Sequence, residues 1–197
     1  YMFLKKSSLI DNTILVITAD HGEEFWDHVE LEKKHFYDPR GFYGVGHGHN
    51  MFNEVIQVPL FIAGPNVKPG MHTYPVGHID LVPTILSLLE LEYDESMFEG
   101  TNLFEKNDDR TIVVEDIAYG YDKLAIIRGD VKYLIAPWDK VFWKFDLSKD
   151  PHENSPETLE VDEIKEMCSF VKFRSKISPI LDKNTALGSL FKGHFIR

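Results

Sequence analysis

The sequence predicts an α/β protein that contains part of an open, mostly parallel sheet with helices on both faces, followed by a small antiparallel α+β subdomain. Two apolar runs, at 13–18 and 58–64, have the continuous hydrophobicity of buried parallel strands. Residues 78–93 repeat apolar side chains at helical spacing. Short β-rich segments separated by turns fill residues 111–145, a pattern typical of an antiparallel meander.

Local patterns predict the elements of the first part of the chain. Residues 1–10 have the character of a helix end, and 11–12 form a turn before the first strand. Residues 26–50 are predicted to be a long polar and aromatic loop. Asp80 is expected to N-cap the helix, and Pro83 suits its first turn. Because two parallel strands do not complete a sheet, we expect the N-terminal half of the domain to lie outside this chain.

The second part has a different pattern, and we place the domain boundary between 1–106 and 107–197. The chain from about residue 157 is predicted to be helical. Four strands are expected before it, at 111–115, 124–128, 131–135 and 141–145.

Composition excludes several classes of protein. With 197 residues, 43% of them hydrophobic, the chain can form a core. Its net charge of -11, with no cluster of Lys or Arg, argues against a nucleic-acid partner. No apolar run is long enough to cross a membrane. Cys168 is the one cysteine, so there is neither an internal disulfide nor a Cys-based zinc cluster. A reducing compartment and secretion both remain compatible with this content.

A cluster of His and Asp residues follows the first predicted strand. Asp20 and His21 come where ligands bind in open parallel sheets, just past a strand's carboxyl end. A carboxylate with an imidazole suits Zn²⁺, Mn²⁺ or Fe²⁺, and Ca²⁺ if further oxygens join. An Asp in this place can also be a simple N-cap, and His21 a surface histidine with ordinary partners. Five of the nine histidines lie between 21 and 49: His21, His28, His35, His47 and His49.

The segment "GVGHGHNMF" strengthens the case for a binding site. His47 and His49 alternate with glycines, so the loop can approach a ligand closely and its imidazoles can ligate a metal or bind an anion. Aromatic residues of the loop at 26–46 either shape a substrate pocket or pack the loop onto the protein: Trp26, Phe36, Tyr37, Phe42 and Tyr43.

These residues carry a resemblance to a known family. The segments "DNTILVITADHGEEF", "HGHNMFNEVIQVPLFIAGP", "VGHIDLVPTILSLLELE" and "FEGTNLF", in this order, resemble the sulfatase family of the alkaline phosphatase superfamily. The later segment "LAIIRGDVKYLIAPWDKVFWKFDLSKDPHENSPE" is similar to that family's C-terminal subdomain. The resemblance covers residues 9–156 and implies an alkaline-phosphatase-like fold.

The resemblance also implies roles for particular residues. Asp20 and His21 match a pair of metal ligands, for Ca²⁺, Mn²⁺ or Zn²⁺. His47 lies close to a substrate-binding Lys or His of the superfamily, so it is the candidate for binding substrate and for catalysis, with His49 as a second catalytic donor. The implied reaction is hydrolysis of a sulfuric or phosphoric ester of a small molecule or glycan, with the metal activating the nucleophile.

One departure limits this interpretation. Sulfatases carry a nucleophile in a C-x-P-x-R or S-x-P-x-R motif, which this chain lacks, and Cys168 has neither the Pro nor the Arg. We therefore expect a C-terminal portion of a larger enzyme, inactive by itself. Two alternatives stay open: a phosphomutase or phosphoethanolamine-type transferase of the same superfamily, and a non-catalytic module with the same fold.

Overall fold

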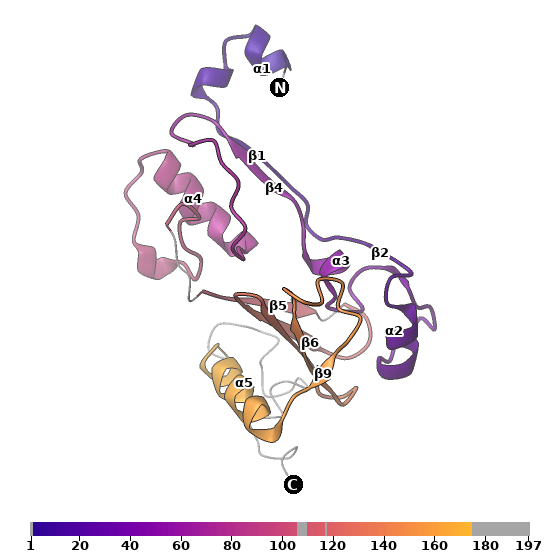
Figure 1. Cartoon of the computed structure of the whole chain (residues 1–197). Helices are drawn as coiled ribbons and strands as arrows, with labels where there is room; N and C mark the ends of the chain where they lie inside the picture. Colours follow the sequence, from indigo (N-terminus) through magenta and orange to yellow (C-terminus); the bar gives the residue numbers. More distant parts are fainter. Residues whose placement is uncertain (1, 106–109, 117, 175–197) are drawn as a thin grey trace. The chain divides into compact units, whose positions relative to one another are not determined.

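The computed structural model describes three stretches of the chain: residues 2–105, 110–116 and 118–174. They form two compact units (Figure 1). The first unit comprises the chain up to Asp20 together with Val58–Ile112. The second comprises His21–Gln57 and the described residues from Val113 onward.

The first unit contains two strands and several short helical segments. Its elements are α1 (Met2–Lys6), η1 (Ile10–Asn12), β1 (Leu15–Thr18), β4 (Leu60–Ala63), η2 (His78–Asp80), α4 (Leu81–Leu88) and η3 (Glu95–Met97). The predicted helix over 78–93 is therefore shorter than expected, a 3-10 turn followed by α4.

The predicted arrangement of the first two strands is wrong in this structure. β1 and β4 pair with each other in antiparallel register, from Leu15 opposite Ala63 to Thr18 opposite Leu60. Neither strand is buried on both faces, because the cross-strand neighbours Ile17 and Phe61 are 53% and 64% exposed. An apolar run predicts a strand, but it carries no information about which strand will pair with it.

Asp80 holds a turn of the first unit together. Its side chain makes no capping bond to α4, contrary to the prediction. The buried carboxylate accepts hydrogen bonds from the backbone N–H groups of Gly77 (2.8 Å) and Thr101 (2.9 Å), and it pairs with the guanidinium of Arg110. Gly77 is local, but Thr101 and Arg110 follow Asp80 by 21 and 30 residues, which helical spacing cannot predict.

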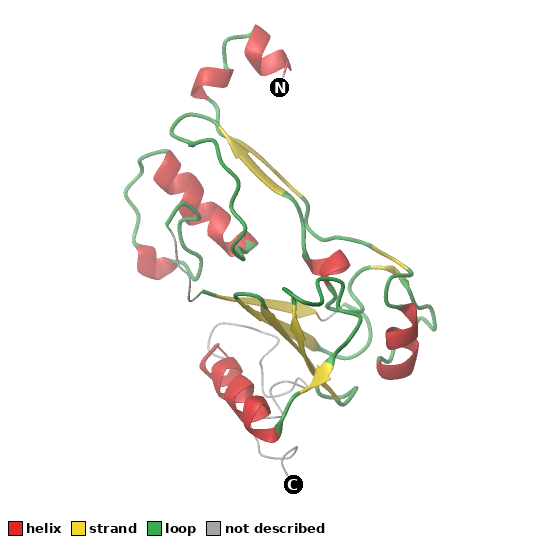
Figure 2. Cartoon of the chain, in the orientation of Figure 1, coloured by secondary structure: helices red, strands yellow, loops and turns green. Residues whose placement is uncertain are grey.

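The second unit is built on a five-stranded sheet in the order β5-β6-β7-β8-β9 (Figure 2). Its strands are β5 (Thr111–Asp116), β6 (Lys123–Arg128), β7 (Val131–Ala136), β8 (Val141–Asp146) and β9 (Glu157–Thr158). The pairs β6–β7, β7–β8 and β8–β9 are antiparallel. The four predicted meander strands are confirmed to within one residue, because apolar alternation and turn residues are local signals.

Shorter elements complete this unit. They are β2 (Glu24–Phe25), α2 (Val29–His35), β3 (Val45–Gly46), α3 (Asn53–Ile56) and α5 (Val161–Arg174). The expectation of a loop throughout 26–50 is wrong, since α2 and β3 lie within it. The predicted C-terminal helix is present as α5. Cys168 lies in α5, but its side chain and the predicted helical tail from residue 175 lie outside the described residues.

The core of the second unit joins the loop to the sheet. Trp143 and Phe145 of β8 pack with Leu134 of β7 and with two residues from before the sheet, Phe36 and Phe52. The segment 21–57 is thereby fixed to the sheet by burial of large aromatic surfaces. Among the described residues, no helix combines the length and the apolar character that crossing a bilayer requires.

Candidate active site

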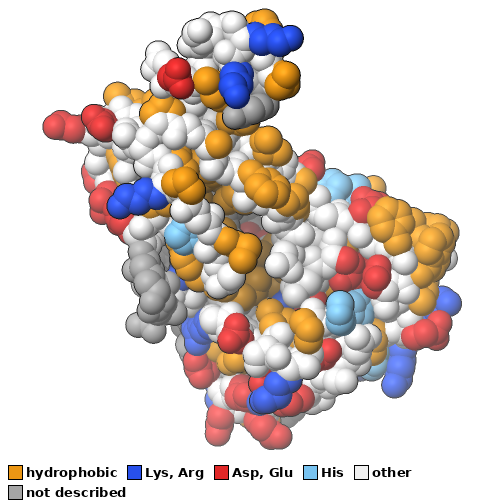
Figure 3. Space-filling model, turned by 45° about the horizontal axis from the view of Figure 1, so that its top comes forward, with side chains coloured by type: hydrophobic (Ala, Val, Ile, Leu, Met, Phe, Trp, Pro, Cys, Tyr) orange, Lys and Arg blue, Asp and Glu red, His pale blue; other side chains and the backbone are white. Residues whose placement is uncertain are grey.

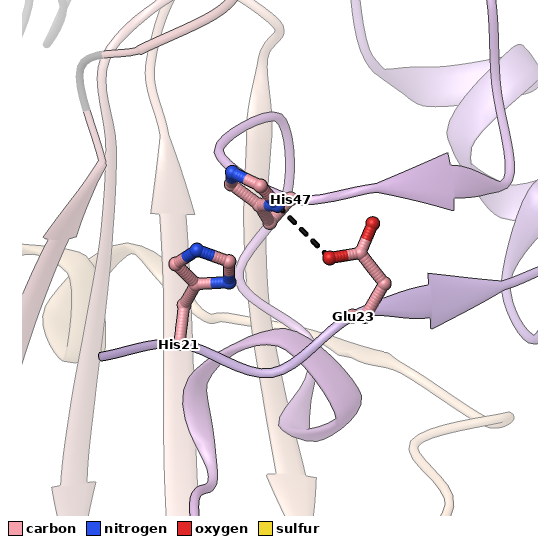
Figure 4. A group of neighbouring side chains, drawn as sticks. All are labelled: His21, Glu23 and His47. Atoms are coloured by element: carbon pink, nitrogen blue, oxygen red, sulfur yellow. Dashed lines mark hydrogen bonds and ion pairs between the residues drawn. The ribbon is translucent and has the colours of Figure 1, made fainter. Parts of the chain in front are cut away.

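The rings of His21 and His47 stack against each other, with their centroids 3.6 Å apart and their planes inclined by 26°. His47 also donates from Nδ1 to the Oε2 atom of Glu23 over 3.0 Å (Figure 4). Nitrogen and oxygen atoms of these three residues lie within 4.8 Å of one another. The structure thus joins the two predicted sequence clusters, since His21 follows the first strand and His47 belongs to the glycine-rich loop.

Backbone geometry explains how the two histidines meet. β2 and β3 pair in antiparallel register with Glu24 opposite Gly46. Glu23, just before Glu24, therefore lies beside His47, just after Gly46. Gly46 and Gly48 flank His47 and have φ values of 105° and 71°, a region that glycine adopts without strain. The glycines thus let the loop turn sharply on both sides of His47.

The residues fit a divalent metal in their donor chemistry. His21 donates from Nδ1 to the carbonyl oxygen of Gly22 over 2.7 Å, and in a neutral ring the lone pair would then be on Nε2. A histidine whose other ring nitrogen donates to a carbonyl is in the form that ligates metals. The carboxylate of Glu23 lies beside it. Asp20 is exposed at the last position of the first unit, directly before His21.

His49 lies in a different environment from His47, although only Gly48 separates them. It is buried, and its Nε2 atom lies 3.2 Å from Glu24 Oε2 and 3.0 Å from Glu32 Oε1. Asn50 donates from Nδ2 to both of these carboxylates, over 2.6 and 2.5 Å. We call Glu24, Glu32, His49 and Asn50 the buried cluster. Imidazole and amide donors occupy its carboxylate oxygens, so it fits a metal less well than the His21 group does.

Electrostatics of the buried cluster favour a charged His49. Burial alone would lower the pKa of His49, but the bonds to Glu24 and Glu32 outweigh it and raise the pKa to about 10. Burial would raise the pKa of Glu32, yet the bonds from His49 and Asn50 lower it to about 2. For Glu24 the effect of burial prevails, and its pKa is raised.

The buried cluster fixes both ends of the loop that carries His47. Glu32 Oε2 accepts from the backbone N–H of Gly44 over 2.7 Å, before His47. After His47, the carboxylates of Glu24 and Glu32 bind His49 and Asn50. Sequence reasoning missed Glu24, Glu32 and Asn50 as partners of His49. The one signal in the sequence was that these polar residues stand among residues that pack into the core. Charged side chains are rarely buried without partners, so burial of the segment would imply that they contact one another.

The loop aromatics divide between the two roles proposed from sequence. Phe36 is buried and packs the loop onto the sheet, whereas Trp26, Tyr37 and Phe42 are exposed. Hydrophobic side chains lie beside histidine and acidic side chains on the surface (Figure 3). Arg40 is held by bonds of 2.6 to 3.0 Å to the buried Asp38, which neutralises its charge.

Comparison with known proteins identifies the family. The model of the Sulfatase family matches residues 3–91. Choline-sulfatase of Rhizobium meliloti is 29% identical over 160 residues, which cover 76% of this chain and 28% of that protein. The match to the Sulfatase family model confirms the resemblance found in the sequence.

Solved structures give the same fold. The phosphonate monoester hydrolase of Silicibacter pomeroyi superimposes with a TM-score of 0.60 at 20% identity, over 92% of this chain and 38% of that one. A protein solved with its substrate D-glucosamine-2-N,6-O-disulfate gives a TM-score of 0.59 at 17% identity, over 94% and 38%. The chain thus spans well under half the length of each of these relatives.

Proposed function

We propose that this chain is part of a metal-dependent hydrolase of sulfuric or phosphoric esters, with sulfate esters favoured. The contact between His21 and His47 carries the proposal. His21 follows β1 and bonds through Nδ1 as metal-ligating histidines do, and its ring contacts that of His47 on the glycine-rich loop. The sequence resemblance implies a metal ligand at His21 and a substrate-binding residue at His47. A non-catalytic module with the same fold would not require this contact between two histidines.

Asp20 and His21 would hold a divalent ion, Ca²⁺, Mn²⁺ or Zn²⁺, through a carboxylate oxygen and the Nε2 atom. Such an ion neutralises ester oxygens and lowers the pKa of a bound nucleophile. Glu23 orients His47 by accepting from Nδ1, so that Nε2 is directed away from the carboxylate. When protonated there, His47 would donate to the charged oxygens of the ester or to the leaving oxygen.

We propose a different role for His49. Its ring is buried and held by two carboxylates, so it cannot reach a substrate without breaking the buried cluster. In this proposal His47 is the catalytic donor of the "HGH" pair, and His49 acts by fixing the loop.

The substrate is proposed to be a sulfated small molecule or glycan. Choline-sulfatase and a protein with a disulfated glucosamine substrate are among the similar proteins, which supports both sizes of substrate. The exposed Trp26 and Phe42 would pack against its organic part.

The chain is further proposed to supply only part of the active site. Ile17 and Phe61 are cross-strand neighbours with more than half of their surfaces exposed, as expected if further protein covers this face of β1 and β4. The nucleophile would belong to that further part, and this chain alone would not hydrolyse esters.

The test begins with the coding sequence upstream of residue 1 and continues with assays of the complete protein on 4-nitrophenyl sulfate and 4-nitrophenyl phosphate. A Cys or Ser in a C/S-x-P-x-R motif and faster sulfate hydrolysis are expected. Turnover by the chain alone would contradict the proposed partial site. An Asp20→Ala variant of the complete protein with an unchanged metal content would refute the role of Asp20.

A second candidate function is phosphoryl transfer within the same superfamily. The similarity to a phosphonate monoester hydrolase favours keeping it. A Thr or Ser beside upstream acidic residues, with the phosphoryl group passed to an alcohol acceptor and not to water, would make this the better assignment.

A further inference from the structure

The turn after β8, Asp150-Pro151-His152-Glu153, has no role in the function proposed above. We call it the DPHE turn. It is held by its own backbone and side chains, since Glu153 donates its N–H to the carbonyl of Asp150 over 3.1 Å, and Asp150 accepts from two later N–H groups. The Glu153 side chain is nevertheless fully buried, together with that of Lys132 from β7.

Glu153 and Lys132 form an ion pair, with 2.6 Å between Oε1 and Nζ. A buried pair of this kind adds little net stability compared with an apolar pair of the same size, because both charges lose their hydration. The polar atoms of a buried ion pair can nevertheless hold other groups in a defined position through further hydrogen bonds. The further hydrogen bonds of Glu153 and Lys132 therefore indicate which segment the pair positions.

Both members of the pair bind the start of α3. Asn53 donates its backbone N–H to Glu153 Oε2 over 2.6 Å, and its Oδ1 atom accepts from Lys132 Nζ over 3.0 Å. The residue before α3 supplies no capping side chain. Glu153 thus satisfies an N-terminal N–H of this four-residue helix from 100 residues away in sequence.

A second connection leads from the DPHE turn to the same helix. His28 bonds through Nε2 to the carbonyl oxygen of His152 over 2.8 Å, and through Nδ1 to Glu54 Oε1 over 2.5 Å. The second residue of α3 is therefore tied to the turn as well.

The end of α3 contacts the active-site backbone. Gly22 donates its N–H to the carbonyl of Val55 over 2.7 Å, and a Cβ atom at Gly22 would overlap the carbonyl oxygen of Glu54. Because Gly22 stands between His21 and Glu23, the position of α3 determines where both side chains begin.

We propose that Glu153, paired with Lys132, is a positioning residue for the His21–His47 contact and acts through α3. The DPHE turn and strand β7, although part of the C-terminal subdomain, thereby help to position the residues of the site. The proposal concerns the geometry of two rings, so it does not depend on whether the esters are sulfates or on whether a metal is bound.

The test is NMR spectroscopy of the chain, with hydrogen exchange at the Gly22 amide and the imidazole resonances of His21 and His47 as readouts. In Glu153→Gln, the Gly22 amide should exchange about tenfold faster and the two ring resonances should shift, while the β7 and β8 amides stay protected. Lys144→Met/Glu157→Met, which removes a pair between the half-buried Lys144 and the exposed Glu157 of the same sheet, should change neither readout.

Lys132→Met/Glu153→Met keeps the volume of the buried pair but removes its hydrogen bonds, and it should give the same changes as Glu153→Gln. Unchanged Gly22 exchange and ring resonances in a folded variant would overturn the proposal. So would equal changes in the control, or a failure of both core variants to fold, since the pair would then serve stability alone.

Discussion

His47 contacts two residues that precede it by more than twenty positions: its ring stacks on His21, and its Nδ1 atom donates to Glu23. Together these contacts fix the orientation of the His47 ring, with one face on His21 and the Nδ1–H directed at Glu23.

Glu23→Gln should weaken this arrangement, because an amide oxygen is a poorer acceptor for the His47 Nδ1–H than a carboxylate. We expect kcat/KM of the complete enzyme to fall about 10- to 100-fold, as for other residues that orient a catalytic or metal-binding histidine. Steady-state kinetics measures this. Glu30→Gln, at an exposed position of α2, is the control. Equal activity of the two variants would remove Glu23 from the site.

Gly22→Ala should destabilise the second unit and displace His21. The added methyl group would overlap the carbonyl oxygen of Glu54, and backbone cannot give way as a flexible side chain can. Overpacking of this kind costs about 1–3 kcal/mol. Urea unfolding measures the loss. Gly70→Ala is the matched control because an added Cβ there meets no atom closer than 4.0 Å. Equal stability of both variants would contradict the close approach of α3.

His49→Leu should destabilise the chain strongly, because it leaves Glu24 and Glu32 buried without their cation. Removing one partner of a buried ion pair costs about 3–5 kcal/mol. Thermal or urea unfolding gives the value. His72→Leu, at an exposed position, should cost far less. If His49→Leu unfolded like the wild type while hydrolysis by the complete protein was lost, His49 would be catalytic and its role in fixing the loop would be refuted.

The buried cluster also predicts how stability depends on pH. The pKa of His49 is raised from 6.5 to about 10, so its contribution is complete below pH 6.5 and is lost as the pH rises through about 10. The pKa of Glu32 is lowered from 4.5 to about 2, so its contribution is complete above pH 4.5 and is lost as the pH falls through about 2.

The difference in unfolding free energy between wild type and His49→Gln should therefore be largest from about pH 4.5 to 6.5 and should shrink toward pH 10. The pKa of Glu24 is raised above 4.5 by burial, so the contribution of Glu24 is present below pH 4.5 and is lost as the pH rises through that raised pKa. Urea titrations at four pH values are sufficient. A difference that stayed constant from pH 6 to pH 10 would show that His49 is not held as a cation.

Local patterns predicted much of this structure, and non-local pairings account for what they missed. The strands from Lys123 to Asp146 follow from alternation and turns within a few residues. The pairing of β1 with β4 joins residues that are 42 to 48 positions apart, from Thr18 opposite Leu60 to Leu15 opposite Ala63, and apolar runs do not encode it. α2 was missed because seven residues give a weak periodic signal.

The same distinction applies to the site. His21 and His47 were found because histidines among glycines and acids are an unusual composition. His49 has the same local signal as His47, and only burial separates them. The support by Lys132 and Glu153 joins residues from three distant segments, so no spacing rule could indicate it.

The most direct test of the central claim is paramagnetic broadening of the histidine NMR signals of this chain by Mn²⁺. We predict that His21 and the adjacent His47 broaden first, that exposed His72 does not, and that Asp20→Asn raises the Mn²⁺ concentration required about tenfold. Equal broadening of His72 and His21, or no effect of Asp20→Asn, would contradict a metal site at Asp20 and His21.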